Sequence, residues 1–180
     1  GTFTLERSST SASIGGTTKS IDLLRIELTG VQLFVGVGGS LETVSGSGAL
    51  VTTNATGFKA QNLTLSIGMA RAPNASGGVD RWTGVEVSAT ELSAVGLPSD
   101  ITGVVRNLSV QFNSSVDGAS VDWSKMTFTP GSALSAISSG RSLMVSGQVR
   151  LNLGGVALAS GSLSLTKTSP TGVSIGASAS

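Results

Sequence analysis

Apolar and polar residues alternate along most of this chain of 180 residues, as they do in β-strands that bury one face. The alternation predicts strands over residues 2–7, 21–37, 58–69, 104–112, 121–123 and 126–128, and a last hairpin over 143–165. The pattern slips at Gly30, where we expect a bulge or a tight bend, and at Gln61-Asn62, where we expect a bulge. Gly154-Gly155 should turn the last hairpin. The chain is therefore predicted to be built mainly from strands and tight turns.

Two segments depart from this pattern. Residues 8–16 are small and polar and end in Gly15-Gly16, which predicts a surface loop after the first strand. Residues 132–139 have helical spacing from Leu134 to Ile137 and should form one or two helical turns.

Parts of the sequence repeat within the chain. Residues 85–92 match residues 26–33 in the phase of their apolar, acidic and small positions, and residues 103–110 resemble residues 57–65 in the same way. The two offsets differ, so we interpret the matches as a degraded duplication that produced two similarly wound halves.

The two ends of the chain carry a stronger match. Residues 1–9 read GTFTLERSS and residues 161–169 read GSLSLTKTS, and with one inserted residue Ser13-Ile14-Gly15 falls on Ser174-Ile175-Gly176. We interpret residues 1–160 as one repeat and residues 161–180 as the start of the next, which predicts a tandem array. The alternative is that two strands of one β protein merely have similar sequences.

Composition excludes several classes of function. The chain has no cysteine and no histidine, which rules out thiol catalysis, thiolate metal sites and a Ser-His-Asp triad. Its net charge is +1 and its basic residues are scattered, so it has no patch suited to nucleic acid. No apolar run is long enough for a membrane helix in this sequence. Charged residues are only 12% of the chain, but the 39% of apolar residues and their alternation argue against disorder.

Two acidic pairs are candidate sites. Asp117 and Asp122 flank a glycine turn, but two carboxylates are too few for a calcium site. A turn-capping role for Asp117 and a solvated strand position for Asp122 explain them better. Glu86 and Glu91 could serve as a glycosidase pair, but an offset of five on one strand puts their side chains on opposite faces.

The remaining candidates also have structural explanations. Trp82 and Trp123 could stack on sugar rings, or they could fill the ends of a core that has few large side chains. The glycines of residues 36–39 resemble a phosphate loop only superficially, because no Lys-Ser/Thr follows. Asn-x-Ser/Thr triplets begin at Asn54, Asn62, Asn74, Asn107 and Asn113. We assign no catalytic, cofactor-binding or metal-binding residue.

The segments 28–39 and 145–167 resemble the long repeats of giant bacterial extracellular proteins. In those surface and adhesin-like polypeptides, a strand ending in Phe-Val-Gly opens a unit and a Gly-x-Val-x-Leu hairpin closes it. The resemblance implies export, tandem repetition and a structural or adhesive role, without catalytic residues. The Gly-Gly-x-Gly-x-Asp repeat of calcium-binding nonapeptides does not occur.

Together these observations predict an all-β module of antiparallel sheets, packed as a sandwich, prism or roll. We expect a non-catalytic structural unit of an exported bacterial surface protein or filament, located outside the cell or on its surface. Its partners would be neighbouring copies of the same repeat, joined by continuous β-structure, with cell-surface glycans as a further candidate. The alternatives are a carbohydrate-binding adhesin module and a pilin-like subunit that polymerises by strand addition.

Overall fold

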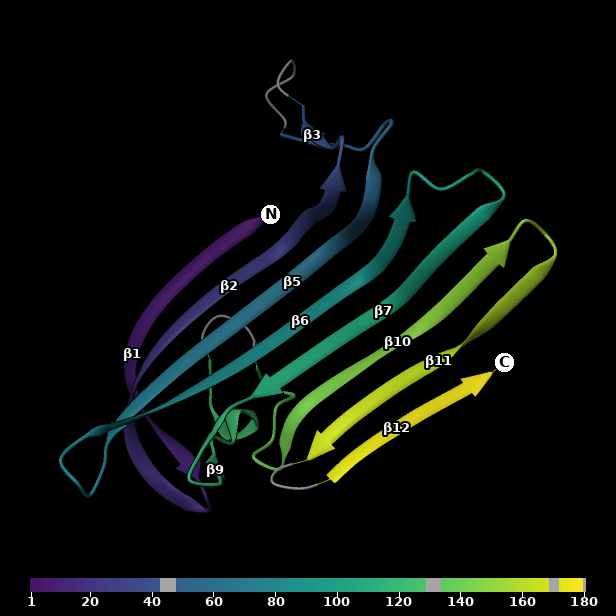
Figure 1. The fold of residues 1–180 in the computed structure, drawn as a ribbon. Coiled ribbons are helices and arrows are strands. Elements are labelled where there is room, and N and C mark those ends of the chain that lie inside the picture. Colours follow the sequence, from purple (N-terminus) through teal and green to yellow (C-terminus); the bar gives the residue numbers. More distant parts are fainter. Residues whose placement is uncertain (43–47, 129–133, 169–171, 180) are drawn as a thin grey trace.

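The computed structural model of the chain describes residues 1–42, 48–128, 134–168 and 172–179. Eight long strands form one open antiparallel sheet, in which each long strand pairs with the long strand that follows it in sequence (Figure 1). They are β1 (Thr2–Ile14), β2 (Thr17–Val37), β5 (Thr56–Pro73), β6 (Val79–Val95), β7 (Ile101–Asn113), β10 (Arg141–Leu153), β11 (Ala157–Thr168) and β12 (Gly172–Ala179). The prediction of an all-β chain built on antiparallel sheet is confirmed.

The remaining elements are short. One ribbon pairs β3 (Ser40–Leu41) with β4 (Leu50–Val51), and another pairs β8 (Ser115–Val116) with β9 (Ala119–Ser120). A 3-10 turn, η1, covers Trp123–Lys125 and is followed by turns at residues 134–136 and 139–140. No helix among the described residues is long or apolar enough to span a membrane.

The long sheet has two chemically different faces. Strand alternation and the pairing register put Phe3, Leu28, Leu65 and Val87 on one side, which we call the open face. Ala12, Leu23, Ala70 and Trp82 lie on the other side, which we call the insert face. Residues 114–140 connect β7 to β10, and described residues of this segment pack against that face. We call residues 114–140 the insert.

The compact core lies between the insert and the lower ends of the first four strands in Figure 1. Trp123, Leu134 and Ile137 of the insert have no exposed surface, and Trp123 lies over Gly68 and Gly84. These two glycines are cross-strand partners, and a Cβ on either would approach the Trp123 ring within 2.6 Å. The glycines therefore make a flat place on the sheet into which the indole fits.

The predicted bulges are present. Pairing between β2 and β5 shifts register on both sides of Val31, where Gly30 has a φ of 65° and Asn62 a φ of 47°. Asn107, which the sequence duplication aligns with Asn62, has a φ of 50° on β7. Glycine and asparagine tolerate this left-handed conformation better than other residues.

Residues matched by the internal sequence similarity lie in common cross-strand rows of the sheet. Ile26 and Val85 are joined in one cross-strand row through Ile67, and Leu65 is joined to Val110 through Val87. Antiparallel pairing makes β2 run in the same direction as β6, and β5 in the same direction as β7. The hairpins β2-β5 and β6-β7 therefore have the same orientation in the sheet, and their matched residues lie at the same level along the strands.

Some local predictions were wrong. Residues 8–14 belong to β1 instead of a loop, because Ala12 and Ile14 are buried under the insert and Ile14 forms a bridge with Val121. Residues 121–128 contain η1 and irregular backbone instead of two strands, since Val121, Trp123 and Met126 all pack into the core. The predicted helical turn appears as a turn at 134–136, and residues 132 and 133 lie outside the described residues.

Candidate functional site

The two tryptophans do not form a sugar-binding platform. Trp82 is 1% exposed and Trp123 is 0% exposed. Trp82 Nε1 donates a hydrogen bond to the Ala119 carbonyl at 2.9 Å, and Trp123 Nε1 donates to Asn113 Oδ1 at 2.9 Å. Both indoles therefore belong to the core under the insert, which is the second of the two interpretations offered by the sequence.

Asp117 and Asp122 are not brought together around a common ligand position. Asp117 lies on an exposed turn with a φ of 51°. The prediction that Asp122 is a solvated strand residue is wrong, because Asp122 is buried and directly precedes η1. It accepts a hydrogen bond from Ser124 Oγ and pairs with Lys125 Nζ at 3.3 Å. Among the described residues, no group of three or more acidic side chains is arranged to hold a metal ion.

Glu86 and Glu91 have separate surroundings. Glu86 lies on the insert face near the backbone of Leu134 and Ala136, and its buried Oε2 has no hydrogen-bond partner among the described residues. Glu91 Oε2 pairs with Arg106 Nε at 3.2 Å. Burial of the carboxyl group raises the pKa of Glu86, and the nearby backbone of Leu134 and Ala136 and the charge of Arg141 oppose this shift. The pair does not converge on a cleft as a glycosidase would require.

The raised pKa of Glu86 gives a prediction about pH. The folded chain holds the Glu86 proton to higher pH than the unfolded chain, in which the pKa lies near its ordinary value of 4.5. This carboxyl group should therefore reduce stability as pH rises from 4.5 through the folded pKa. Glu86→Gln should remove that contribution, so that the variant gains on the wild type between acidic and neutral pH. Urea unfolding of the wild type and of Glu86→Gln, at acidic and at neutral pH, measures the difference in their free energies of unfolding. The same difference at both pH values would contradict the prediction.

The glycines of residues 36–39 have a packing role. A Cβ on Gly39 would lie 2.4 Å from the Phe34 ring, and a Cβ on Gly36 would lie 2.2 Å from the Thr56 carbonyl oxygen. The close approach of Phe34 and of the next strand thus explains the motif that resembled a phosphate loop.

The asparagines of the Asn-x-Ser/Thr triplets also have structural roles. Asn54, Asn62 and Asn107 adopt positive φ at turns or bulges. Asn74 accepts hydrogen bonds from the backbone of Ser76 and Gly78 within its loop. Asn113 is 1% exposed and donates hydrogen bonds to the Val121 and Ser138 carbonyls, so it ties the two ends of the insert to β7.

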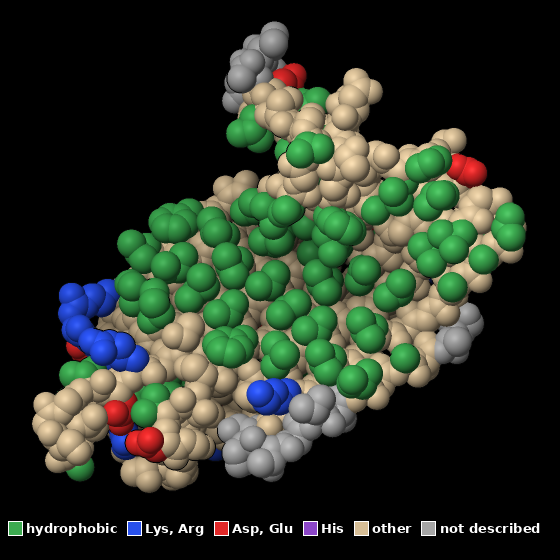
Figure 2. Space-filling view, in the orientation of Figure 1, with side chains coloured by type: hydrophobic (Ala, Val, Ile, Leu, Met, Phe, Trp, Pro, Cys, Tyr) green, Lys and Arg blue, Asp and Glu red, His purple; other side chains and the backbone are tan. Residues whose placement is uncertain are grey.

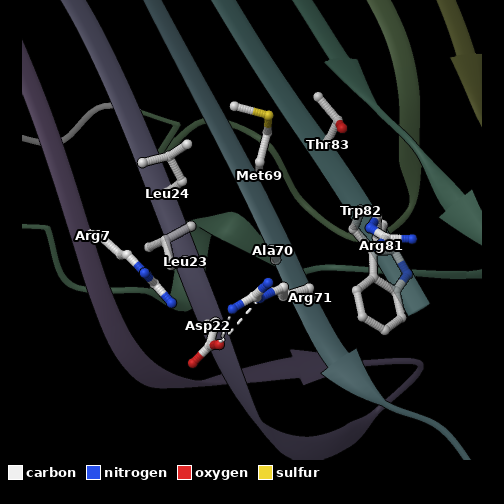
Figure 3. A pocket seen from close by; sticks show the side chains of 10 residues that line it. All are labelled: Arg7, Asp22, Leu23, Leu24, Met69, Ala70, Arg71, Arg81, Trp82 and Thr83. Atoms are coloured by element: carbon white, nitrogen blue, oxygen red, sulfur yellow. Dashed lines mark hydrogen bonds and ion pairs between the residues drawn. The ribbon is translucent and has the colours of Figure 1, made fainter. Parts of the chain in front are cut away.

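One charged cluster was not found from the sequence. Arg7, Asp22, Arg71 and Arg81 lie on four different strands at one end of the open face, around a shallow pocket of about 390 Å³ (Figure 3). Arg71 binds Asp22 through Nε and Nη2 at 3.1 and 2.8 Å, and this hydrogen bonding lowers the pKa of Asp22. The residues are far apart in sequence, and only the cross-strand register brings them together.

The free edges of the sheet are a second feature. β1 and β12 are the outermost strands, and each pairs with one long strand only. The backbone groups on their outer sides face away from the sheet, and such edges readily accept a further strand. The chain therefore offers two surfaces for strand addition, one at each side.

The matching ends of the sequence occupy related positions in the sheet. β11 lies six strands from β1, so antiparallel pairing makes the two strands run in the same direction. Phe3 and Leu5 lie on the open face, as do Leu163 and Leu165. The cross-strand row from Phe3, here called the Phe3 row, passes through Leu28, Leu65, Val87, Val110 and Val145 to Leu165. The sequence counterpart of Phe3 is Leu163, so the two copies are offset by two residues along the strand.

The match between the ends has a limit. Ser13 and Ile14 belong to β1, whereas Ser174 and Ile175 belong to β12, so the longer alignment does not join equivalent positions. Ile14 is held in β1 by its contacts with the insert, and Ile175 is 74% exposed. The predicted boundary between residues 160 and 161 falls inside β11.

The fold and these surfaces define an all-β chain with a long, open-edged antiparallel sheet, one face of which is partly covered by the insert. Comparisons with protein-family models, curated proteins and solved structures find no match to the chain.

Proposed function

We propose that this chain is a structural, non-catalytic repeat unit of an exported bacterial surface protein or extracellular filament, in which continuous β-structure joins neighbouring units. Residues 1–160 would be one repeat, and residues 161–180 would begin the next. The proposal draws its location and source from the resemblance of residues 28–39 and 145–167 to extracellular bacterial repeats.

The observation that carries this proposal is the relation between β1 and β11. The two strands have similar sequences, the same direction and corresponding apolar side chains on the open face, and β11 lies six strand positions from β1. A shift of one repeat along the sheet would therefore put β1 of one unit in the position of β11 of the preceding unit. At the usual spacing of about 4.8 Å between strands, each repeat would add about 29 Å and slide by about 7 Å along the strands.

Such a join has two physical consequences. Each unit covers an edge of its neighbour, which protects that edge from uncontrolled pairing with other chains. The hydrogen-bonded junction also resists bending, whereas a Gly/Ser linker would let the units move independently. Both consequences suit a spacer or filament.

A fused chain tests the proposal. Residues 1–160 would be followed directly by residues 1–180, so that the second β1 can take the position of β11. We expect its amide groups that point away from β2 to exchange with solvent about 100-fold more slowly than those of the first β1. The control joins two complete chains through a Gly/Ser linker, which leaves the register free. Equal exchange of the second β1 in the two fusions would overturn the proposal.

The same open edges favour a second candidate, a pilin-like subunit that polymerises by strand addition. The mass of the intact natural polypeptide separates the two. A mass far above 17.8 kDa supports the tandem array, and a mass near this value supports separate subunits. The third candidate, a carbohydrate-binding module, has lost its motivating feature because both tryptophans are buried.

A further inference from the structure

The open face is a broad apolar surface that no described element of the chain covers. Figure 2 shows hydrophobic side chains spread over most of the sheet on this side. The Phe3 row illustrates the composition, since all seven of its residues from β1 to β11 are apolar. Phe3, Phe58 and Val35 are 61%, 57% and 62% exposed, whereas apolar residues under the insert on the other face are buried. Large contiguous apolar patches of this kind mark interaction surfaces.

Charges on this face lie at its border. Arg7 in the middle of β1 and Asp22, Arg71 and Arg81 near ends of β2, β5 and β6 form the cluster beside the apolar area, and Lys167 lies near the end of β11. On β2, every described open-face residue from Leu24 to Val35 is apolar. An apolar centre with charged residues at the rim is the usual anatomy of a protein interface.

The area suits a stable contact. Seven strands from β1 to β11 span about 30 Å, and the apolar stretch of β2 spans about 40 Å, which gives on the order of 1,000 Å². A standard interface buries about 800 Å² on each partner. The open face therefore offers enough apolar surface for one specific partner of its own size.

Large and small side chains are segregated on this surface. At the strand ends remote from the arginine cluster, β2 and β5 carry Leu33, Val35 and Phe58. At the same level β11 carries Ala157, Ala159 and Gly161. Consider a two-fold axis that runs parallel to the strands between two facing copies. It would put the large side chains of each copy over the small side chains of the other, so the same contact would form twice.

We propose that the open face packs against the open face of a second copy of this chain, about a two-fold axis close to the strand direction. The result is a two-layer β-sandwich, in which the sheets lie about 10 Å apart and the apolar rows interdigitate. Leu33 and Phe58 of each copy fill the space above Ala159 and Gly161 of the other. The arginine clusters and Lys167 remain at the rim, in contact with solvent. The proposal does not depend on the tandem array.

Oligomeric state tests this inference. The 180-residue chain should sediment in the micromolar range with twice its mass of 17.8 kDa. Leu163→Lys introduces a charge into the open face, where Leu163 is 41% exposed, and should raise the dissociation constant at least about 100-fold because the change enters the interface twice. Ser164→Lys is the matched control, because it adds the same charge to the next residue of β11 on the opposite face. It should leave the dimer unchanged.

A second variant tests the orientation. Ala159 is exposed, so Ala159→Phe should fold normally but should weaken the dimer about 10-fold or more, because it fills the space assigned to Leu33 and Phe58. Circular dichroism checks that Leu163→Lys and Ala159→Phe retain the sheet. An unweakened Ala159→Phe dimer would overturn this alignment of the two copies.

Three results would overturn the proposal itself. A wild-type chain that is monomeric in the micromolar range has no self-complementary face. A monomer that binds vesicles of phosphatidylcholine and phosphatidylglycerol would identify a lipid surface as the occupant instead. A dimer that survives Leu163→Lys but is lost when proline is introduced into the β1 or β12 edge would show edge-to-edge pairing instead of stacked faces.

Discussion

Trp123→Ala is expected to lower the free energy of unfolding by about 3–5 kcal/mol, because it removes one of the two largest side chains of a small core and leaves a cavity. The indole is 0% exposed and lies over Gly68 and Gly84, which have no side chains that could fill the space. The change also leaves Asn113 Oδ1 without its hydrogen bond from Trp123 Nε1. Urea unfolding, followed by circular dichroism, measures the loss.

Trp123→Phe is the control for this experiment. It keeps an aromatic ring over the two glycines but removes the hydrogen bond and part of the volume, so we expect a loss of about 1–2 kcal/mol. Limited proteolysis should cleave Trp123→Ala within residues 114–140 before the sheet is attacked, because the insert loses its main anchor. A Trp123→Ala chain as stable as Trp123→Phe would show that the insert does not hold this core together.

The sequence predicted the sheet well where the alternation of apolar and polar residues within a strand is enough to identify that strand. Alternation located β2, β5, β7 and the last hairpin, and the slips at Gly30 and Asn62 located the bulges. It failed where a distant segment decides the structure. Residues 8–14 are small and polar like a loop, but they extend β1 because the insert, about 100 residues later in the chain, packs on Ala12 and Ile14.

For the candidate sites too, the sequence was informative about local features but not about contacts between distant segments. The sequence offered core filling as one of two interpretations of Trp82 and Trp123, and the glycine after Asp117 was enough to indicate a turn. The cluster around Arg71 and Asp22 needed the register of four strands, which spacing alone does not supply. The open face was equally hidden, because alternation shows that a strand has an apolar side but does not show whether that side is covered.

The two faces of the sheet have different physical roles. The insert face makes a closed core with Trp82, Trp123 and the glycine pair, so the single chain folds around it. The open face contributes little to that core, since Phe3 and Val35 remain more than half exposed. Substitutions on the insert face should therefore change the stability of one chain, whereas substitutions on the open face should change its association with another.

Arg25→Ala is expected to cost about 3–5 kcal/mol, because Arg25 is a buried cation on the insert face and its removal leaves carboxylates without compensation. The guanidinium is 1% exposed, lies 2.9 Å from Glu6 and 3.8 Å from Glu27, and stacks over the Phe128 ring at 5.5 Å. Glu6 is 38% exposed and retains solvent, but Glu27 is only 16% exposed. Most of the electrostatic loss should therefore come from Glu27.

A double-mutant cycle separates this loss from the loss of packing. Arg25→Met keeps most of the side-chain volume, and in that background Glu27→Gln should recover about 1–3 kcal/mol, because the charge that has lost its partner is removed. In the wild-type background, Glu27→Gln should be neutral or destabilising. Arg106→Met is the matched control: Arg106 is 49% exposed and pairs with Glu91 at 3.2 Å, so we expect a loss of about 0–1 kcal/mol. If Glu27→Gln recovers nothing in the Arg25→Met background, the side chain of Arg25 stabilises the fold by packing alone.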